Sequence, residues 1–281
     1  MKTWLLIAHK APLGGSLNMA VDEYLFTRAR EGARTFLRFY RWERPTASLG
    51  YGQDAARAAD LDFCHANGID VVRRMTGGKV VLHHKELTYS LASSDTETFT
   101  ATLRDSYQLI SLALIKGLAL MGLSARLALA SPPAYVRGTM PCFAFPARDE
   151  VEIGGRKIIG SAQKRTGTSF IQHGSVPFEK DEALLKAVAR SDAEDAGLNM
   201  TSLSEALGRP VAFDWAAVRF SLGVSSSSGS SWNPSPLMRR LGRRSPGSRP
   251  SATATTPGLS GVRLTFLDFE CYYHSGIEII P

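Results

Sequence analysis

Short apolar segments separated by glycine or proline turns fill most of residues 1–180, and one long apolar helix interrupts them. The short segments are rich in Val, Ile, Thr, Phe and Tyr, a composition typical of β-strands. The helix, residues 103–121, is rich in Leu, Ile and Ala and is followed by Gly122, a residue type that commonly ends helices. We therefore predict an α/β (α+β) fold, a mixed, mostly antiparallel sheet flanked by helices. The predicted strands are residues 4–9, 35–40, 46–49, 70–74, 79–83, 87–92, 150–153, 156–162 and 170–178. The other predicted helices are one that begins near Ser16, a short one that contains Cys64 and ends at Asn67-Gly68, and residues 181–190, 202–207 and 214–222.

The composition changes abruptly after Val224. Residues 225–231 have the sequence SSSSGSS, and Arg, Pro, Ser and Thr dominate from there to Ser260 without any Asp or Glu. Such a segment has too few apolar side chains to build a core. We therefore divide the chain into a folded domain, residues 1–224, and a low-complexity basic tail, residues 225–281. The tail is either disordered or the product of a shifted reading frame that has replaced the final helices.

The formal net charge of +7 is unevenly distributed. The tail has six Arg against three acidic residues, a net charge of +3, which leaves +4 for residues 1–224. A domain with so mild a positive charge, and with no interleaved aromatic and basic residues, indicates an acidic protein partner rather than a nucleic acid.

The N-terminal segment and the cysteines indicate the cellular compartment. The N-terminal apolar run is interrupted by His9 and Lys10, so it is too short for a membrane span or a secretion signal. The three cysteines, Cys64, Cys142 and Cys271, are widely and irregularly spaced, which fits neither a disulfide framework nor a paired-cysteine metal site. We expect reduced thiols, no membrane association and a cytoplasmic location.

A glycine loop with the sequence RRMTGGK, residues 73–79, lies between two predicted strands. It combines cationic side chains with glycines that let a ligand approach the backbone closely. It is not a Walker phosphate loop, because that motif opens a helix and has Ser or Thr after its lysine, whereas Val80 follows Lys79 here. Two interpretations stay open at this point, a ligand-binding loop and an ordinary Gly-Gly hairpin.

A thiol and an amine downstream of this loop are candidates for acyl chemistry. Cys142 lies between Pro141 and Pro146, in a segment that can be neither a regular helix nor a central strand. Reactive groups often lie on such loops, although most free cysteines are inert and buried. Lys157 enters a strand that is apolar on both faces, where it either contacts a substrate carbonyl or extends to solvent. A thiol that accepts an acyl group and an ammonium group that stabilises its carbonyl oxygen would together favour acyl transfer.

Histidines end or interrupt apolar strands at three positions, His83, His84 and His173. No carboxylate or thiol stands at metal-ligand spacing beside them, so we predict no metal site. We expect hydrogen-bonding roles for His83 and His173, with a structural role in the core as the alternative.

Five segments share a pattern with one known family: residues 18–23 (NMAVDE), 73–83 (RRMTGGKVVLH), 86–90 (ELTYS), 155–163 (GRKIIGSAQ) and 172–175 (QHGS). Together they resemble the biotin/lipoate protein ligase and lipoyltransferase family (BPL/LPL). The resemblance spans residues 3–222 and implies that residues 1–224 form a class II synthetase-like BPL/LPL catalytic domain.

Cys142 and Phe143, ahead of the turn that precedes Lys157, resemble the cysteine-dependent octanoyltransferase and lipoate-protein ligase A-like branch, and also the lipoyl-domain amidotransferases. Lys79 stands where ATP-dependent lipoate ligases usually have a third glycine, which favours a transferase. By this resemblance, Cys142 is the acyl-accepting thiol and Lys157 the family lysine. The implied substrate-binding residues are Arg73, Arg74, Thr76, Gly77, Gly78, Lys79, His83, Gly160, Ser161, Ala162, His173 and Gly174.

The resemblance implies a reaction in protein lipoylation. An octanoyl or lipoyl group would move from acyl carrier protein to a lipoyl-domain lysine through a cysteine thioester, without a cofactor. The implied acceptors are glycine cleavage H protein and the E2 subunits of 2-oxoacid dehydrogenases. The alternatives are a lipoate-protein ligase that needs ATP and magnesium, a lipoyl-domain amidotransferase, and a catalytically silent ligand-binding module. The motifs leave the acyl donor, the chain length and the oligomeric state open.

Overall fold

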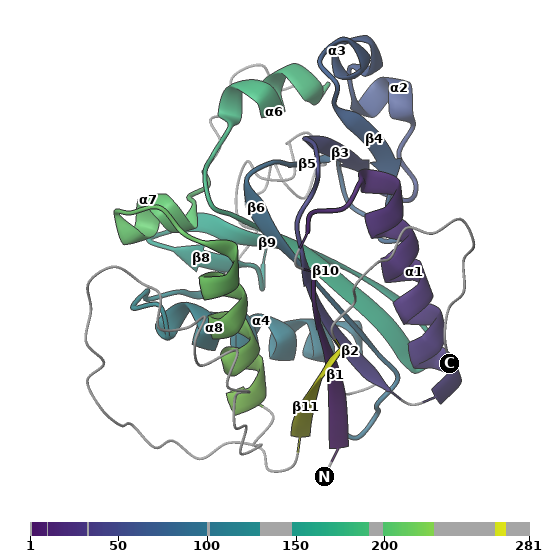
Figure 1. Ribbon diagram of the computed structural model, residues 1–281, viewed down its shortest axis with the longest axis vertical. Coiled ribbons are helices and arrows are strands. Elements are labelled where there is room, and N and C mark those ends of the chain that lie inside the picture. Colours follow the sequence, from purple (N-terminus) through teal and green to yellow (C-terminus); the bar gives the residue numbers. More distant parts are fainter. Residues whose placement is uncertain are drawn as a thin grey trace.

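The computed structural model describes residues 2–9, 11–32, 34–99, 102–129, 148–190, 199–227 and 262–267. The strands are β1 (Lys2–Ala8), β2 (Thr35–Tyr40), β3 (Thr46–Leu49), β4 (Asp70–Arg73), β5 (Val81–His83), β6 (Glu86–Ser93), β7 (Arg126–Leu127), β8 (Val151–Ile153), β9 (Arg156–Thr166), β10 (Ser169–Pro177) and β11 (Val262–Leu267). They form two sheets, an eight-stranded one in the order β11-β1-β2-β6-β10-β9-β8-β7 and a three-stranded one in the order β4-β3-β5 (Figure 1).

Helices cover both faces of the larger sheet, and others pack against the smaller one. The helices of the described residues are α1 (Gly15–Gly32), α2 (Ala55–Ala58), α3 (Leu61–Ala66), α4 (Leu103–Ala119), α6 (Glu182–Val188), α7 (Leu203–Leu207) and α8 (Phe213–Ser227). Helix α1 lies on one side of the sheet and α4 and α8 on the other (Figure 1). The mixed sheet flanked by helices confirms the predicted fold class.

Strand alternation supplies the apolar residues for both faces. On β1, Leu6 belongs to the core under α4 and α8, whereas the next residue, Ile7, belongs to the core under α1. On β2 the same alternation separates Leu37 from Phe36. Because successive side chains of a strand point to opposite faces, central strands with continuous apolar runs are buried on both sides.

Strand pairing in the smaller sheet excludes one of the two interpretations of the glycine loop, the Gly-Gly hairpin. Strand β3 pairs in parallel with β4 and antiparallel with β5, so β4 and β5 are not hydrogen-bonded to each other. The Gly-Gly hairpin interpretation is therefore wrong. The loop instead crosses the end of β3, where Arg74 N donates to Leu49 O at 3.0 Å and Tyr51 N donates to Thr76 O at 2.8 Å.

The hairpin turn that the sequence predicts at Gly154 and Gly155 is present in the structure. Strands β8 and β9 are antiparallel, and Gly154 and Gly155 between them have φ angles of 58° and 78°. Two successive positive φ angles are typical of a tight hairpin turn that favours glycine. This turn sets where β9 begins and therefore where Lys157 lies.

Part of the predicted tail belongs to the larger sheet. Strand β11 runs parallel to β1, with a register from Lys2↔Val262 to Ile7↔Leu267. Residues 228–261 and 268–281 lie outside the described residues, so the predicted division of the chain at residue 224 stays a prediction.

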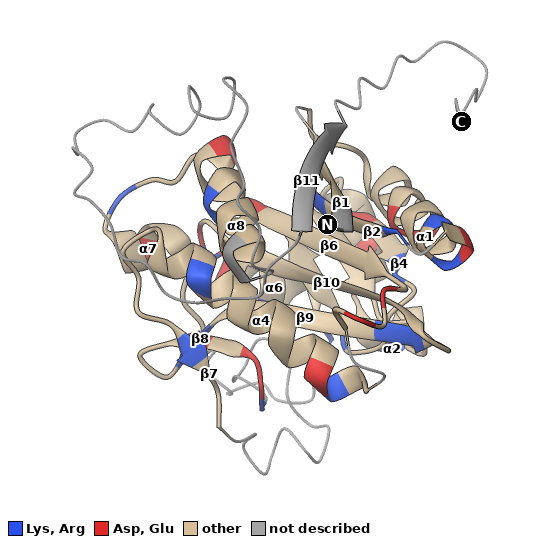
Figure 2. Cartoon of the chain, turned by 90° about the horizontal axis from the view of Figure 1, so that it is seen from below, with Lys and Arg blue, Asp and Glu red and all other residues tan. Residues whose placement is uncertain are grey.

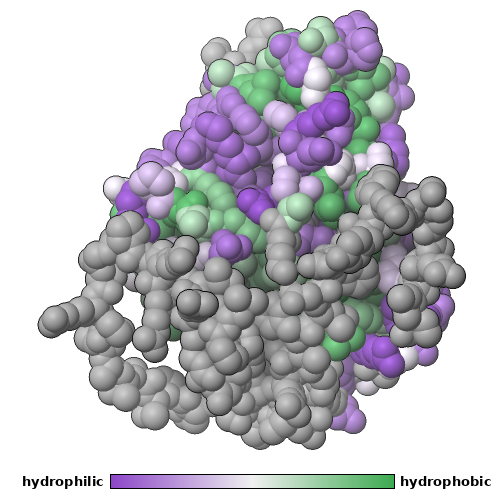
Figure 3. Space-filling view, in the orientation of Figure 1, coloured by the Kyte–Doolittle hydropathy of each residue, from purple (hydrophilic) through white to green (hydrophobic). Residues whose placement is uncertain are grey.

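Charged residues lie mainly on helices and loops, and the strands of the larger sheet are mostly uncharged in the view of Figure 2. In the space-filling view, hydrophilic and hydrophobic patches alternate around the smaller sheet and α6 (Figure 3). Among the helices of the described residues, none has the length and apolarity needed to cross a membrane. A charged side chain inside the larger sheet is thus an exception, and burial of a charge requires a partner.

Two glycines let α4 and α8 approach each other closely. A Cβ atom added at Gly223 would lie 2.4 Å from the Gly117 nitrogen and 2.6 Å from the Ala113 carbonyl oxygen. A Cβ atom added at Gly117 would lie 2.7 Å from Phe220 Cδ1 and 2.9 Å from its Cα. Backbone thus packs directly on backbone where these helices cross.

The variant Gly223→Ala should lower the free energy of unfolding by about 1–3 kcal/mol, because the added methyl group overlaps backbone atoms that have no room to move. Urea denaturation followed by circular dichroism measures the change. Gly32→Ala is the matched control, since the nearest atom to its added Cβ lies 3.8 Å away, and it should not destabilise the protein. Equal stability of Gly223→Ala and the wild type would contradict the close crossing.

Candidate active site

A cavity of about 90 Å³ lies where the smaller sheet meets the larger one. Its walls come from α1, from strands of both sheets and from the glycine loop. Predicted site residues from three separate sequence segments converge there. They are Arg74, Gly78, His83, Gly160, Ser161, Ala162, His173 and Gly174.

Arg74 fixes the glycine loop from inside. Its Nη1 donates to the Ser48 carbonyl oxygen at 2.6 Å and to Ser48 Oγ at 3.1 Å. Its Nη2 donates to the carbonyl oxygens of Gly77 at 2.9 Å and Lys79 at 2.7 Å. Gly77 and Lys79, both predicted to bind substrate, lie outside the cavity lining and contribute these backbone acceptors.

Arg73 points to the other side of the loop. Its Nη1 donates to the carbonyl oxygens of Gly50, Tyr51 and Gln53 at 2.9, 3.0 and 2.7 Å. Arg73 does not line the cavity. It therefore holds the segment after β3 beside the glycine loop.

Two close approaches fix the shape of the cavity. A Cβ atom added at Gly50 would lie 1.9 Å from the Gly78 carbonyl oxygen, and one added at Gly174 would lie 2.6 Å from Tyr89 Cε1 and 2.7 Å from the Gly160 carbonyl oxygen. Glycine is therefore required for space at both positions, beside Gly78 and Gly160, which line the cavity.

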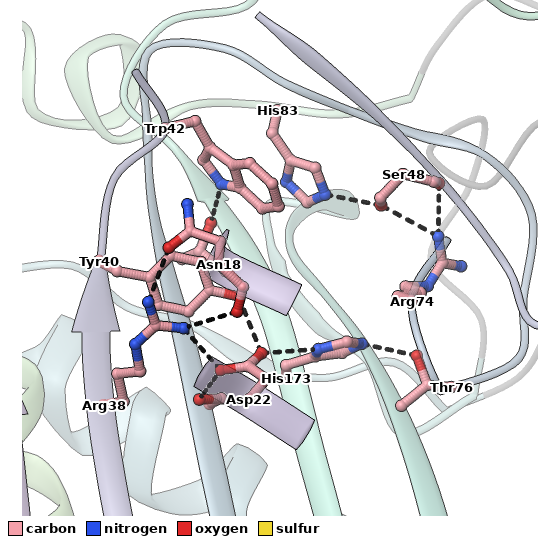
Figure 4. A network of polar contacts seen from close by, with 12 residues as sticks. Asn18, Asp22, Arg38, Tyr40, Trp42, Ser48, Arg74, Thr76, His83 and His173 are labelled. Carbon is pink, nitrogen blue, oxygen red and sulfur yellow. Dashed lines mark hydrogen bonds and ion pairs between the residues drawn. The ribbon is translucent and has the colours of Figure 1, made fainter. Parts of the chain in front are cut away.

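Asp22 of α1 is the centre of a buried polar network (Figure 4), two of whose members, Tyr40 and His173, also line the cavity. Its carboxylate accepts hydrogen bonds from Arg38 Nη1 at 2.7 Å, Tyr40 Oη at 3.0 Å and Ser90 Oγ at 2.7 Å. Burial alone would raise the pKa of Asp22, but the Arg38 guanidinium and the hydrogen bond from His173 lower it to about 2. The carboxyl group is therefore ionised at neutral pH.

Arg38 connects Asp22 to the first strand and to α1. Its Nε donates to His9 Nε2 at 3.0 Å, and its Nη2 donates to Asn18 Oδ1 at 2.7 Å. Burial and the adjacent guanidinium lower the pKa of His9 from 6.5 to about 4. His9 is therefore neutral at pH 7 and accepts the Arg38 hydrogen bond through its unprotonated Nε2.

His173 links this network to the glycine loop. Its Nδ1 lies 3.3 Å from Asp22 Oδ2 and its Nε2 lies 2.6 Å from Thr76 Oγ1 (Figure 4). Burial lowers the pKa of His173 against the raising effect of Asp22. In the neutral ring Nδ1 donates to the carboxylate, so Nε2 accepts from the Thr76 hydroxyl. The predicted hydrogen-bonding role of His173 is thus a structural one that holds the loop.

His83 stands in a second polar chain, closer to the smaller sheet. Its Nε2 lies 2.7 Å from Ser48 Oγ and its Nδ1 lies 2.8 Å from Glu86 Oε1. The imidazole stacks on Trp42 with ring centroids 4.1 Å apart and an interplanar angle of 14°. Glu86 Oε2 also accepts from Ser175 Oγ at 2.5 Å. Both rings and the hydroxyls of Ser48 and Ser175 line the cavity.

Lys157 is fully buried and forms an ion pair with Glu150. Its Nζ lies 2.7 Å from Glu150 Oε1, and the two side chains are 0% and 6% exposed. The alternative that Lys157 extends to solvent is therefore wrong. Glu150 lines the cavity, whereas Lys157 lies behind it, so the ammonium group is one hydrogen bond from the cavity wall.

Cys142 lies outside the described residues, and its predicted position beside Lys157 stays a prediction. Within the residues that the structure describes, no cluster of three or more His, Cys, Asp or Glu residues could hold a metal ion. Cys64, the free cysteine that is described, is buried in the core of the smaller sheet, and burial raises the pKa of its thiol.

Solved structures with a similar fold are those of lipoate-protein ligases. Lipoate-protein ligase A bound with ATP has a TM-score of 0.69 to this chain, covering 86% of it and 93% of the ligase at 22% identity. A bi-partite lipoate protein ligase from Thermoplasma acidophilum has a TM-score of 0.65 and covers 86% and 91% at 22% identity. The chain therefore has the fold of the lipoyl ligases.

Residues 15–222 match the lipoyl protein ligase A/B catalytic domain, and the chain belongs to that family. It is 41% identical over 184 residues to octanoyltransferase LipM of Carboxydothermus hydrogenoformans, covering 64% of this chain and 67% of the relative. It is 34% identical over 251 residues to octanoyltransferase LipM of Kyrpidia tusciae, covering 84% and 91%. The chain is thus an enzyme of the lipoyl ligase and transferase kind, which confirms the predicted class.

Several residues of the cavity and its network were not predicted. Asn18 and Asp22 lie four residues apart on one face of α1, and Arg38 interrupts the apolar strand TFLRFY. Lys157 was predicted as a site residue because it is a charged residue in an apolar strand. Arg38 has the same feature, which could have indicated the buried network around Asp22. The unpredicted lining residues are Met19, Tyr40, Trp42, Ser48, Val81, Thr88, Glu150 and Ser175.

The variant His9→Asn should remove part of the acid sensitivity of the fold. The His9 pKa falls from 6.5 in the unfolded chain to about 4 in the folded protein, so between these values the unfolded chain binds a proton that the folded protein does not. Wild-type stability should therefore fall by about 3 kcal/mol from pH 7 to pH 4 through His9.

Asparagine keeps an acceptor for Arg38 without titrating in this range. Urea denaturation of both proteins across these pH values measures the difference, with the exposed His65→Asn as control. Parallel pH profiles for His9→Asn and the wild type would contradict the assignment. Asp22 does not obscure the window, because its pKa is about 2.

The variant Lys157→Ala should lower the free energy of unfolding by about 3–5 kcal/mol, because it removes the ammonium group that lies 2.7 Å from the buried Glu150 carboxylate. The double variant Lys157→Met/Glu150→Gln removes both charges and should recover most of that loss. Urea denaturation of the three proteins measures it. A stable single variant, or a double variant less stable than the single one, would show that the ion pair does not carry this energy.

Proposed function

We propose that this protein is an octanoyltransferase of protein lipoylation that forms a thioester on Cys142. The observation that carries the proposal is the 33–41% identity to octanoyltransferases LipM, over as much as 84% of this chain and 91% of a relative. The convergence of the family-like segments on one cavity supports it. The ligase alternative has less support, because the lipoate ligase structures are only 22% identical and share the fold alone.

The proposed reaction has two balanced steps. The Cys142 thiolate attacks the octanoyl thioester of acyl carrier protein, so a new C–S bond forms and the carrier leaves as its thiol after taking up a proton. A lysine amine of a lipoyl domain then attacks the enzyme thioester. The amide bond forms, the amine loses a proton, and Cys142 is released. Because the acyl group arrives activated, this route needs neither ATP nor another cofactor.

Lys157 and Glu150 have separate roles in the proposal. Lys157 supplies the cation that stabilises the developing carbonyl oxygen. Glu150 binds the Lys157 ammonium at 2.7 Å and forms part of the cavity wall, so it holds that cation directly behind the wall against which the substrate would lie. Arg74, Gly78 and His83 also line the cavity.

Apolar burial can hold the acyl chain. Met19, Trp42 and Val81 contribute apolar surface to the cavity. Burial of seven methylene and methyl groups stabilises the complex by about 5 kcal/mol, at about 0.8 kcal/mol for each group.

The proposed acceptors are lipoyl domains, including glycine cleavage H protein and the E2 subunits of 2-oxoacid dehydrogenases. The fold shared with a bi-partite lipoate protein ligase and the family membership support a lipoyl-domain partner. The proposal also includes octanoyl-acyl carrier protein as the donor and a cytoplasmic location. The mild positive charge of residues 1–224 supports an acidic protein donor, and the reduced thiols expected from the sequence support the location.

Incubation with octanoyl-acyl carrier protein should add one octanoyl group to the wild type, on the Cys142 peptide, as an adduct that neutral hydroxylamine releases. Cys142→Ala should lose this adduct and slow transfer to a lipoyl domain by at least about 100-fold, because the covalent route is gone. Intact-mass and peptide mass spectrometry measure both. Cys64→Ala, which removes the buried thiol of the smaller sheet, is the control and should transfer normally.

Normal transfer by Cys142→Ala would overturn the thioester route. Parallel reactions with lipoate plus ATP and magnesium, and with an octanoylated lipoyl domain, identify the donor. Charging of the enzyme only by the octanoylated domain would favour the amidotransferase alternative, and lipoylation that requires ATP would favour the ligase.

A further inference from the structure

We propose that Ser48 is a second acyl-accepting group in the cavity, activated by His83 and Glu86, and that it gives the protein esterase and thioesterase activity on medium-chain acyl compounds. Ser48 Oγ, the His83 imidazole and the Glu86 carboxylate form a continuous chain with distances of 2.7 and 2.8 Å. Hydroxyl, imidazole and carboxylate in this order are the arrangement that activates a serine nucleophile.

The surroundings of His83 select the ring tautomer that this chemistry requires. Glu86 accepts from Nδ1, so Nε2 is the nitrogen that takes the Ser48 proton. The ring is held by its stack on Trp42 at 4.1 Å, and the carboxylate is held by the hydroxyls of Ser175 and Thr88. Each group is therefore oriented before a ligand binds.

A cation lies beside the proposed nucleophile. Arg74 Nη1 is 3.1 Å from Ser48 Oγ, and the bonds from Arg74 to three backbone carbonyl groups hold the guanidinium in place. Attack by Ser48 on an acyl carbon would develop an oxyanion within reach of this positive charge. Ser48, His83 and Arg74 all line the cavity.

The other hydroxyl, imidazole and carboxylate chain in the site lacks these properties. Thr76 does not line the cavity. Asp22, the acid of that chain, is committed to Arg38 at 2.7 Å, and its pKa is about 2. The chain Thr76–His173–Asp22 therefore holds the glycine loop, whereas the Ser48 chain can meet a ligand.

The proposed chemistry is balanced in both steps. Ser48 Oγ attacks the acyl carbon, an ester bond forms, and the bond to the alcohol or thiol leaving group breaks. The Ser48 proton passes to His83 Nε2 and from there to the leaving group. Water then attacks the ester while His83 takes its proton, and that proton returns to Ser48 Oγ as the fatty acid leaves.

The test uses the full chain with Cys142→Ala, so that it does not depend on the Cys142 thioester. The probes are p-nitrophenyl octanoate, followed by release of nitrophenolate, and the octanoyl thioester of a small thiol, followed by thiol release. We expect turnover of both and an octanoyl ester on the Ser48 peptide that resists neutral hydroxylamine. Adding Ser48→Ala should lower the rate by at least about 100-fold and abolish the adduct.

Two further variants separate catalysis from folding. Ser48→Cys in the same background should give an adduct at residue 48 that neutral hydroxylamine releases, because the oxygen ester becomes a thioester. Glu86→Gln should slow turnover by at least about tenfold and leave the adduct on Ser48. Ser221→Ala is the matched control, since its buried hydroxyl donates to the Val218 carbonyl oxygen on α8 at 2.8 Å, away from the cavity, and its rate should be unchanged.

Unchanged hydrolysis in Cys142→Ala/Ser48→Ala would overturn the proposal, as would an adduct that maps to another residue or no acylation of Ser48→Cys. Loss of the activity in Cys142→Ala alone would assign it to the thiol and overturn the Ser48 proposal while supporting the Cys142 route. The two proposals are therefore distinguished by the same set of proteins.

Discussion

The ion pair between Asp22 and Arg38 joins α1 to the centre of the larger sheet, and the rest of the site is arranged on it. Through Asp22 the pair also contacts Ser90 on β6 and His173 on β10, so four elements share one buried carboxylate. Removing one partner from such a pair costs about 3–5 kcal/mol. The hydrogen bond that Thr76 Oγ1 donates to His173 Nε2 then extends this constraint to the glycine loop.

The glycine loop is consequently held by polar contacts from several directions. Arg74 binds its carbonyl oxygens from inside, Arg73 ties the segment after β3 beside it, and His173 holds Thr76. A loop with two glycines would otherwise be free to adopt many conformations. These contacts preorganise the wall against which an acyl carbonyl would lie, and preorganised dipoles and charges are the main source of electrostatic catalysis.

Features encoded by neighbouring residues could be predicted from the sequence, and those set by distant contacts could not. The turn at residues 154 and 155 follows from the local preference of Gly-Gly for positive φ, and the convergence of His83 and Gly174 on one cavity followed from family-like segments. The position of β3 between β4 and β5 depends on pairing partners that no local pattern specifies. The ion pair of Asp22 and Arg38 likewise exists only because α1 packs against β2.

The crossing of α4 and α8 has a consequence for how the protein can open. At Gly117 and Gly223 no side chain separates the two backbones, so neither helix can slide along the other without steric overlap. The pair therefore moves as one rigid layer. Neither helix contributes a residue to the cavity lining, so the cavity can change shape without deforming this layer.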